Sequence, residues 1–200
     1  MSTLVVPDPS LVALVGPAGS GKSTLAARHF APDEILSSDE LREAIAGDAR
    51  DQRATRAAFG ALHRQLARRL AAGQLTVVDA TSVERHARTA LLGRARDAGV
   101  PAVAIVLDLP PSIVLARNAA RAERPVDPGV VRHHLATLRS AVDLGLLAHE
   151  EWTLLLRIRD AAELDELRIE RRRQPGLSRR RPPTPGPTRP RSGRSRRRPG

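Results

Sequence analysis

The sequence predicts an α/β fold of three layers, in which helices cover both faces of a mostly parallel, about five-stranded sheet. Short apolar runs alternate with longer stretches of helical periodicity, which is the order of repeated strand–helix units. Apolar residues make up 41% of the 200 residues, enough for a domain with a core of its own. We therefore expect a single α/β domain over residues 1–170.

The basic residues are concentrated at the C-terminal end. Residues 171–200 contain twelve Arg, seven Pro and four Gly but no Asp or Glu. The whole chain has a net charge of +11, so without these twelve positive charges residues 1–170 have a net charge of −1. Such a segment cannot bury a core, so we expect a disordered Arg/Pro-rich tail over 171–200. Two interpretations of the tail stay open: nonspecific contact with nucleic acid through phosphates, or a read-through or shifted-frame end without a selected role.

The expected compartment follows from features that the sequence lacks. It has no cysteine, so disulfides and cysteine-based metal sites are excluded. The first fifteen residues carry neither the basic nor an adequate apolar segment of a signal peptide, and no run of eighteen apolar residues occurs. We expect a cytoplasmic protein without membrane contacts.

The first predicted strand, Leu11–Val15, leads into a glycine-rich loop that fits G-x-x-x-x-G-K-[ST]. Glycines let backbone N–H groups turn inward, and the following helix adds the positive end of its dipole, so the loop suits phosphate. Lys22, the only lysine beside 32 arginines, should reach the β- and γ-phosphates of ATP, and Ser23 should ligate Mg²⁺. The predicted loop consists of Gly16, Pro17, Ala18, Gly19, Ser20, Gly21, Lys22, Ser23 and Thr24.

After the loop, helices and strands are expected to alternate up to residue 171. Pro32, Gly73, Gly99 and Pro125 mark helix ends, because proline disfavours helical geometry in the preceding residue and glycine readily leaves a helix. The expected strands are 34–37, 75–79, 103–107 and, as the last one, 152–156. The expected helices are 22–30, one from 38, 51–72, 84–98, one from 111, 127–147 and 161–171.

Two carboxylates follow the ends of predicted strands. Asp39 comes shortly after strand 34–37, and Asp79 ends strand 75–79. Because the carboxyl ends of parallel strands meet at the edge of the sheet where ligands bind, both should lie near the phosphate loop. Beside such a loop we expect Asp79 to support Mg²⁺ rather than only to cap a helix. Arg42 follows Asp39 by one helical turn, on the same face.

The predicted helix from residue 111 carries arginines at helical spacing. Arg117 and Arg121 are four residues apart, and Arg124 follows just before Pro125. Three arginines so spaced point to one place, and preorganised positive charge stabilises a transferring phosphoryl group. By spacing alone, a solvated helix face in an Arg-rich chain is the favoured alternative.

Five segments, in their order and spacing, resemble a known family. The segments are G-P-A-G-S-G-K-S-T-L-A, S-S-D-E-L-R, D-Q-R-A-T-R-A-A-F, L-T-V-V-D-A-T-S-V and R-N-A-A-R-A-E-R. Over residues 10–170 the chain resembles the kinase domain at the start of bacterial polynucleotide kinase-phosphatases, RNA-repair enzymes of the P-loop kinase superfamily. The resemblance implies a P-loop fold with a helical lid that bears arginines.

The resemblance also implies roles for single residues. Asp39 would be the general base for the acceptor hydroxyl, and Arg42 would hold the 3′-phosphate of the acceptor. Arg117 and Arg121 would clamp the donor phosphates from the lid, and we add Arg124 to the nucleotide contacts.

Two departures from the family limit what the resemblance implies. Ser82 stands where the family usually has Asn. The chain lacks the metallophosphatase and nucleotidyltransferase domains of full-length members, so those activities are not expected here. Separate phosphatase or ligase repair partners are a further expectation.

We weigh three functions. The first is an ATP- and Mg²⁺-dependent kinase of the 5′-hydroxyl of RNA or DNA. Only Phe30, Phe59 and Trp152 are aromatic, so such an enzyme should recognise the phosphate backbone rather than stack on bases. The second is a P-loop kinase of a small-molecule hydroxyl. The third is a non-catalytic nucleotide- or nucleic-acid-binding fragment, and the intact set of site residues argues against it.

Overall fold

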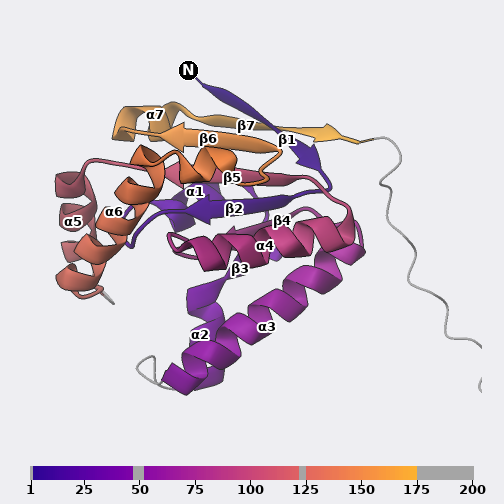
Figure 1. Cartoon of the computed structure of the whole chain (residues 1–200), viewed down its shortest axis with the longest axis horizontal. Coiled ribbons are helices and arrows are strands. Elements are labelled where there is room, and N and C mark those ends of the chain that lie inside the picture. The colour runs from indigo at the N-terminus through magenta and orange to yellow at the C-terminus, as the bar shows by residue number, and fades with distance from the viewer. Residues whose placement is uncertain (1, 47–51, 122–124, 175–200) are drawn as a thin grey trace, which may run out of the picture.

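A five-stranded parallel sheet forms the centre of the computed structural model, which describes residues 2–46, 52–121 and 125–174 (Figure 1). The strand order is β3-β4-β2-β5-β6, and every neighbouring pair is parallel. The strands are β2 (Leu11–Val15), β3 (Ile35–Ser37), β4 (Thr76–Asp79), β5 (Ala102–Leu107) and β6 (Leu154–Ile158). The predicted α/β fold with about five parallel strands is confirmed.

Helices cover both faces of this sheet. In β2, Val12 and Leu14 pack toward α1 and α7, whereas Leu11 and Ala13 pack toward α3 and α4, as the pleat of a strand requires. A third apolar cluster joins β5 to α6. The helices of the described residues are α1 (Lys22–His29), α2 (Ser38–Ala46), α3 (Gln52–Ala71), α4 (Arg85–Ala98), α5 (Pro111–Ala119), α6 (Pro128–Asp143) and α7 (Ala161–Glu166), with short 3₁₀ turns at Pro32–Glu34 and Leu146–His149.

A second, two-stranded sheet was not predicted. It pairs β1 (Thr3–Asp8) in parallel with β7 (Arg168–Arg173), so segments from the two ends of the described chain lie side by side (Figure 1). The helix expected over 161–171 is therefore wrong beyond Glu166, and 152–156 is not the last strand. The run Arg168–Arg173 shows no apolar alternation that would indicate a strand, and only its backbone pairing with β1 defines it.

Two further boundaries differ from the expectation. The helix expected over 127–147 ends at Asp143, because Gly145 takes a left-handed φ of 67° and a 3₁₀ turn follows. Residues 171–173, which we assigned to the disordered tail, belong to β7. The tail from residue 175 lies outside the described residues. None of the described helices has the length and apolar character needed to span a membrane.

The sheet places the predicted site residues at one edge. The loop that follows β2 begins at the same edge where β4 ends in Asp79, because Leu14 is in register with Asp79. On the other side of β4, Ser37 at the end of β3 is also in register with Asp79. Asp39 lies two residues beyond Ser37, in the first turn of α2. The shared edge predicted from the sequence is therefore confirmed.

Candidate active site

The P-loop is a tight turn in which the backbone requires glycine at two positions. Gly21, at the start of α1, has a φ of 97°, and Gly19 has a φ of 84°. A Cβ added to Gly19 would lie 2.4 Å from the backbone oxygen of Val114 in α5. Side chains at these positions would be strained and would push the loop away from the lid helix. The absence of a side chain at Gly19 therefore lets the loop pack closely against α5.

Lys22 folds back over this loop. Its Nζ donates a hydrogen bond of 2.8 Å to the backbone oxygen of Pro17, and the residue is only 9% exposed. Burial lowers the pKa of Lys22 to about 8, although the carboxylates of Asp79 and Asp39 oppose this shift, and Arg121 adds to it. The charges of these three residues therefore reach Lys22, which sits at the point where the predicted site residues converge.

Ser23 and Asp79, which the sequence predicts to ligate or support Mg²⁺, lie in direct contact. The Ser23 hydroxyl donates to Oδ2 of Asp79 at 2.6 Å, and Asp79 is buried at the end of β4. No group of three or more His, Asp or Glu side chains that could hold a metal occurs in the described part. The pair suits Mg²⁺, which commonly takes one or two protein oxygens and completes its shell with water and phosphate. Ser20 Oγ, also in the loop, is buried and has no hydrogen-bond partner among the described residues.

Asp39 and Arg42 lie at the start of α2. Their side chains form an ion pair across one helical turn, and Arg42 Nε also donates to the backbone oxygen of Ser38 at 3.3 Å. The Asp39 side chain is 65% exposed and that of Arg42 is 32% exposed. The Asp39 carboxylate is therefore accessible from solvent, while its charge still reaches Lys22 inside the site.

The predicted lid is described in part. Arg117 lies on α5, and its Nη1 would be 3.6 Å from a Cβ placed on Gly21, so its guanidinium borders the P-loop. Arg121 follows α5, is exposed, and affects the pKa of Lys22. No acidic partner of either arginine occurs among the described residues. Arg124 lies outside the described residues.

A buried ion pair next to the loop after β4 was not predicted from the sequence. Arg88 of α4 is 0% exposed and donates to Glu150 from Nε at 2.9 Å and from Nη2 at 2.8 Å. Its Nη1 donates to the backbone oxygens of Ser82 and Val83, in the loop after Asp79. Trp152 Nε1 donates to the same carboxylate at 3.0 Å. In a chain with 32 arginines, no sequence signal distinguishes Arg88.

This network holds the loop after β4 against the P-loop. The backbone N–H of Gly16 donates to the oxygen of Thr81 at 3.0 Å, one residue before the segment that Arg88 binds. Ser82 has a φ of 46°, the only positive φ of a non-glycine residue in the described ranges. Asparagine adopts this conformation more readily than serine does, which gives a backbone reason for the Asn that the resembling family usually has there.

Fold and site together define a protein of the P-loop kinase-like class, with a parallel sheet, a phosphate loop and arginines beside it. The model of the AAA domain family matches residues 11–144. The chain belongs to that family. A search of curated proteins finds no significant match.

Solved structures with this fold act on different substrates. A chain of the Pnkp1/Rnl/Hen1 RNA repair complex has a TM-score of 0.60 and 20% identity, over 70% of this chain and 47% of that chain. A sugar kinase from Janibacter sp. HTCC2649 has a TM-score of 0.53 and 21% identity, over 76% of this chain and 86% of that chain. The APS kinase CysC of Mycobacterium tuberculosis, in complex with AMPPNP and APS, has a TM-score of 0.51 and 18% identity, over 80% of this chain and 94% of that chain. The chain thus spans about half of the repair protein, and the likeness establishes the fold.

Proposed function

We propose that this chain transfers the γ-phosphate of ATP to the 5′-hydroxyl of RNA or DNA. The observation that carries the proposal is the convergence of Lys22, the Ser23–Asp79 pair and the exposed Asp39 at one sheet edge. A cation, an oxygen pair and an accessible carboxylate are what phosphoryl transfer to a hydroxyl needs. The segments that resemble polynucleotide kinases, and the fold shared with a chain of an RNA repair complex, favour a polynucleotide as acceptor.

The donor side of the proposed reaction relies on fixed positive charge. The P-loop N–H groups and Lys22 bind the phosphates, and Ser23 with Asp79 would hold Mg²⁺. Bound ATP with Mg²⁺ supplies the phosphoryl group and neutralises part of its charge. Arg117 and Arg121, which have no acidic partner among the described residues, are free to stabilise the charge that develops on the transferring phosphoryl oxygens.

The acceptor side relies on Asp39. Its carboxylate accepts the proton of the acceptor hydroxyl as the oxygen attacks phosphorus. Arg42 pairs with Asp39 and would offer its guanidinium to an acceptor phosphate next to the reacting hydroxyl. An acceptor with a phosphate beside the reactive end therefore fits this pair better than an uncharged one.

A small-molecule hydroxyl is the second candidate acceptor. The fold is shared with a sugar kinase and with an APS kinase, and the donor half of the site would work identically with such a substrate. The two proposals differ only in what reaches Asp39. A binding module without turnover, the third alternative, would not need Asp39 at all.

The test is transfer of labelled γ-phosphate from ATP to an oligonucleotide with a 5′-hydroxyl, next to the same strand already 5′-phosphorylated. We expect label on the first strand only. Asp39→Asn should lower the transfer rate at least about a hundredfold with ATP affinity nearly unchanged. Glu40→Gln removes a neighbouring exposed carboxylate and should behave like the wild type. Label on neither strand, with ATP still bound, would contradict the polynucleotide proposal.

A further inference from the structure

Helix α3 is strongly basic along its whole length. Its 20 residues contain five arginines and no Asp or Glu. One side of the helix is apolar and buried, and it packs with α4 and β4 in one cluster. The buried residues of that side are Ala58, Leu62, Leu66 and Leu70. Arginines on the other side are not needed for this packing, so their presence calls for another explanation.

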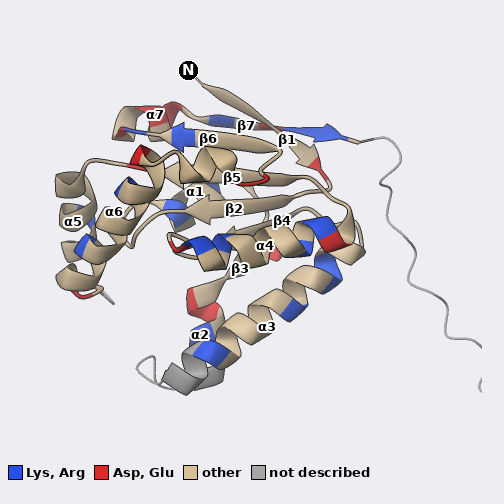
Figure 2. Ribbon diagram, viewed as in Figure 1, with Lys and Arg blue, Asp and Glu red and all other residues tan. Residues whose placement is uncertain are grey.

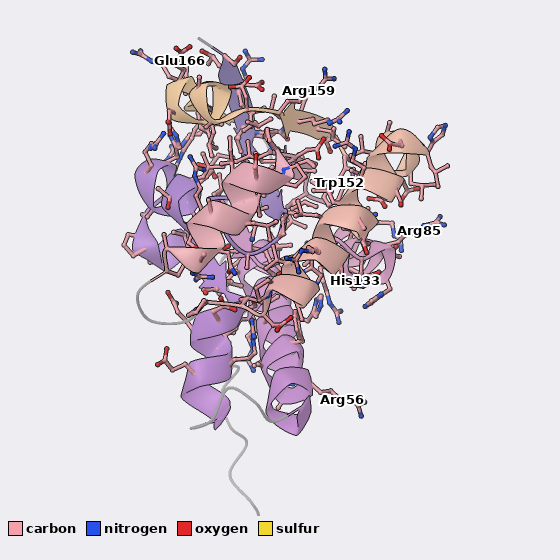
Figure 3. All side chains as sticks on the ribbon, turned by 90° about the vertical axis from the view of Figure 1, so that its left-hand side faces the viewer. Arg56, Arg85, His133, Trp152, Arg159 and Glu166 are labelled. Atoms are coloured by element: carbon pink, nitrogen blue, oxygen red, sulfur yellow. The ribbon has the colours of Figure 1, made fainter. Side chains whose placement is uncertain are left out.

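Three of these arginines form a row on the exposed side. Arg56, Arg64 and Arg68 are all exposed and stand at multiples of four residues, with Gly60 at the missing step. Residues four apart share one side of a helix, and twelve residues rise about 18 Å. Figure 2 shows the basic segments along α3, and in Figure 3 Arg56 points away from the ribbon.

The charge of the row is left unpaired within the part of the chain that the structure describes. No acidic side chain of the described residues pairs with Arg56, Arg64 or Arg68. Some exposed arginines elsewhere have such partners, for example Arg28, which pairs with Asp165 at 3.5 Å, and Arg96, which pairs with Glu151 at 3.5 Å. Three guanidinium groups along one side of the helix, without acidic partners among the described residues, are suited to a polymer that carries regularly spaced negative charge.

An aromatic side chain accompanies the row. Phe59 is three residues from Arg56, hence its neighbour on the helix surface, and is 39% exposed. Phe30 is buried, and Trp152 is partly buried with its N–H bonded to Glu150. Although we expected no base stacking, Phe59 therefore offers one exposed aromatic face, on the same helix as the arginines. Arginines with an exposed aromatic ring are typical of surfaces that bind single-stranded nucleic acid.

The row lies on the helix that packs beside the predicted acceptor end of the site. Helix α2 begins with Asp39 and packs against α3, and the two helices lie side by side in Figures 1 and 3. Helix α3 is therefore the neighbouring element that a strand with its 5′ end at Asp39 would meet next.

We infer that Arg56, Phe59, Arg64 and Arg68, here called the α3 row, bind the sugar–phosphate backbone and one base of the acceptor strand beyond its reacting end. This inference rests on the proposed function, and it adds that the acceptor is a single strand several nucleotides long. A purely acidic peptide such as polyglutamate would satisfy the arginines but has no ring to stack on Phe59.

The first test measures binding without transfer. Fluorescence anisotropy of a labelled 20-mer with a 5′-hydroxyl is recorded at several salt concentrations for the full chain and for the triple variant Arg56→Gln/Arg64→Gln/Arg68→Gln. Three lost phosphate contacts should reduce the slope of log affinity against log salt by about 2, at about 0.7 per contact for single strands. The matched control Arg139→Gln/Arg159→Gln/Arg168→Gln removes the same charge from other elements and should keep the wild-type slope.

Phe59→Ala separates a strand from other polyanions. It should weaken 20-mer binding about tenfold without changing the salt slope, because stacking on one base contributes about 1–3 kcal/mol and no charge. Competition by polyglutamate should be unaffected by this substitution. An unchanged slope in the α3-row triple variant, an equal loss in the control triple, or polyglutamate competing as well as poly(dT) would each overturn the inference.

A second measurement keeps this inference distinct from the proposed function. If the kinase acts on strands, the α3-row triple variant should raise KM for the 20-mer at least tenfold but not KM for a nucleoside 3′-phosphate, which is too short to reach α3. Loss of salt-dependent binding in a chain that transfers no phosphate would uphold the α3 row and refute the kinase. Normal transfer to both acceptors by the triple variant would refute the α3 row alone.

Discussion

Replacing Lys22 by Met tests how much the buried Lys22 ammonium lowers the free energy of unfolding. Burial lowers the pKa of Lys22 from 10.5 to about 8, so the folded chain holds this proton less tightly than the unfolded chain does. At about 1.4 kcal/mol per pH unit, the buried ammonium opposes folding by about 3 kcal/mol at pH 7. Methionine keeps the apolar stem without the charge, but it leaves the oxygen of Pro17 without its 2.8 Å hydrogen bond, at a cost of about 1 kcal/mol. We expect Lys22→Met to be more stable by about 2 kcal/mol.

The pH dependence makes this prediction specific. Between pH 8 and 10.5 the unfolded chain binds more protons than the folded chain, so wild-type stability should rise with pH, by about 3 kcal/mol in all. The chain has no Cys or Tyr, and Lys22 is its only lysine, so no other side chain titrates in the upper part of this range. The advantage of Lys22→Met should therefore shrink with pH and reverse by about 1 kcal/mol near pH 10.5.

Urea unfolding at pH 7, 8.5, 9.5 and 10.5, followed by fluorescence of the single tryptophan, measures the difference directly. The same variant should lose ATP binding, because the ammonium that meets the phosphates is gone. Lys22→Arg keeps a charge that does not titrate here, so it should gain no stability at pH 7. A Lys22→Met chain that is no more stable than wild type at pH 7, with a difference that does not vary with pH, would refute the reasoning.

Two further substitutions test the parts that hold the site. Arg88→Met leaves the Glu150 carboxylate buried without its partner and should lower the free energy of unfolding in urea by about 3–5 kcal/mol. Adding Glu150→Gln should recover most of this loss. Simple additivity of the two effects would contradict a coupled pair. Gly19→Ala places a Cβ 2.4 Å from the oxygen of Val114 at a φ of 84° and should raise the Kd for ATP more than about tenfold, by calorimetry. ATP binding at wild-type strength would contradict the geometry assigned to the loop.

Local sequence features predicted the central part of the fold. The apolar run of β2, the glycine pattern of the P-loop and the start of α1 at Lys22 are confirmed as a continuous unit. Gly73 and Gly99 mark the ends of α3 and α4 to within about two residues. These features are predictable because each depends on the backbone preferences and apolar periodicity of a few adjacent residues.

The meeting of Asp39, Asp79 and the P-loop was also predictable, although the residues are far apart in sequence. Parallel strands present their carboxyl ends at one edge, so a strand pattern followed by a carboxylate indicates a place in space as well as in the chain. The roles assigned to Asp39, Arg42 and the lid arginines remain predictions until phosphoryl transfer is measured.

The sequence by itself determined the parallel α/β fold and the edge where the site residues gather, because short-range patterns and strand direction encode both. Only the tertiary structure decided the pairing of β1 with β7 and the buried Arg88–Glu150 pair. Periodicity indicates which side of an element is buried but not which distant strand supplies its backbone hydrogen bonds. Likewise, the sequence of an Arg-rich chain does not show which carboxylate pairs with a given buried arginine, because the partner and the depth of burial depend on how the completed layers pack.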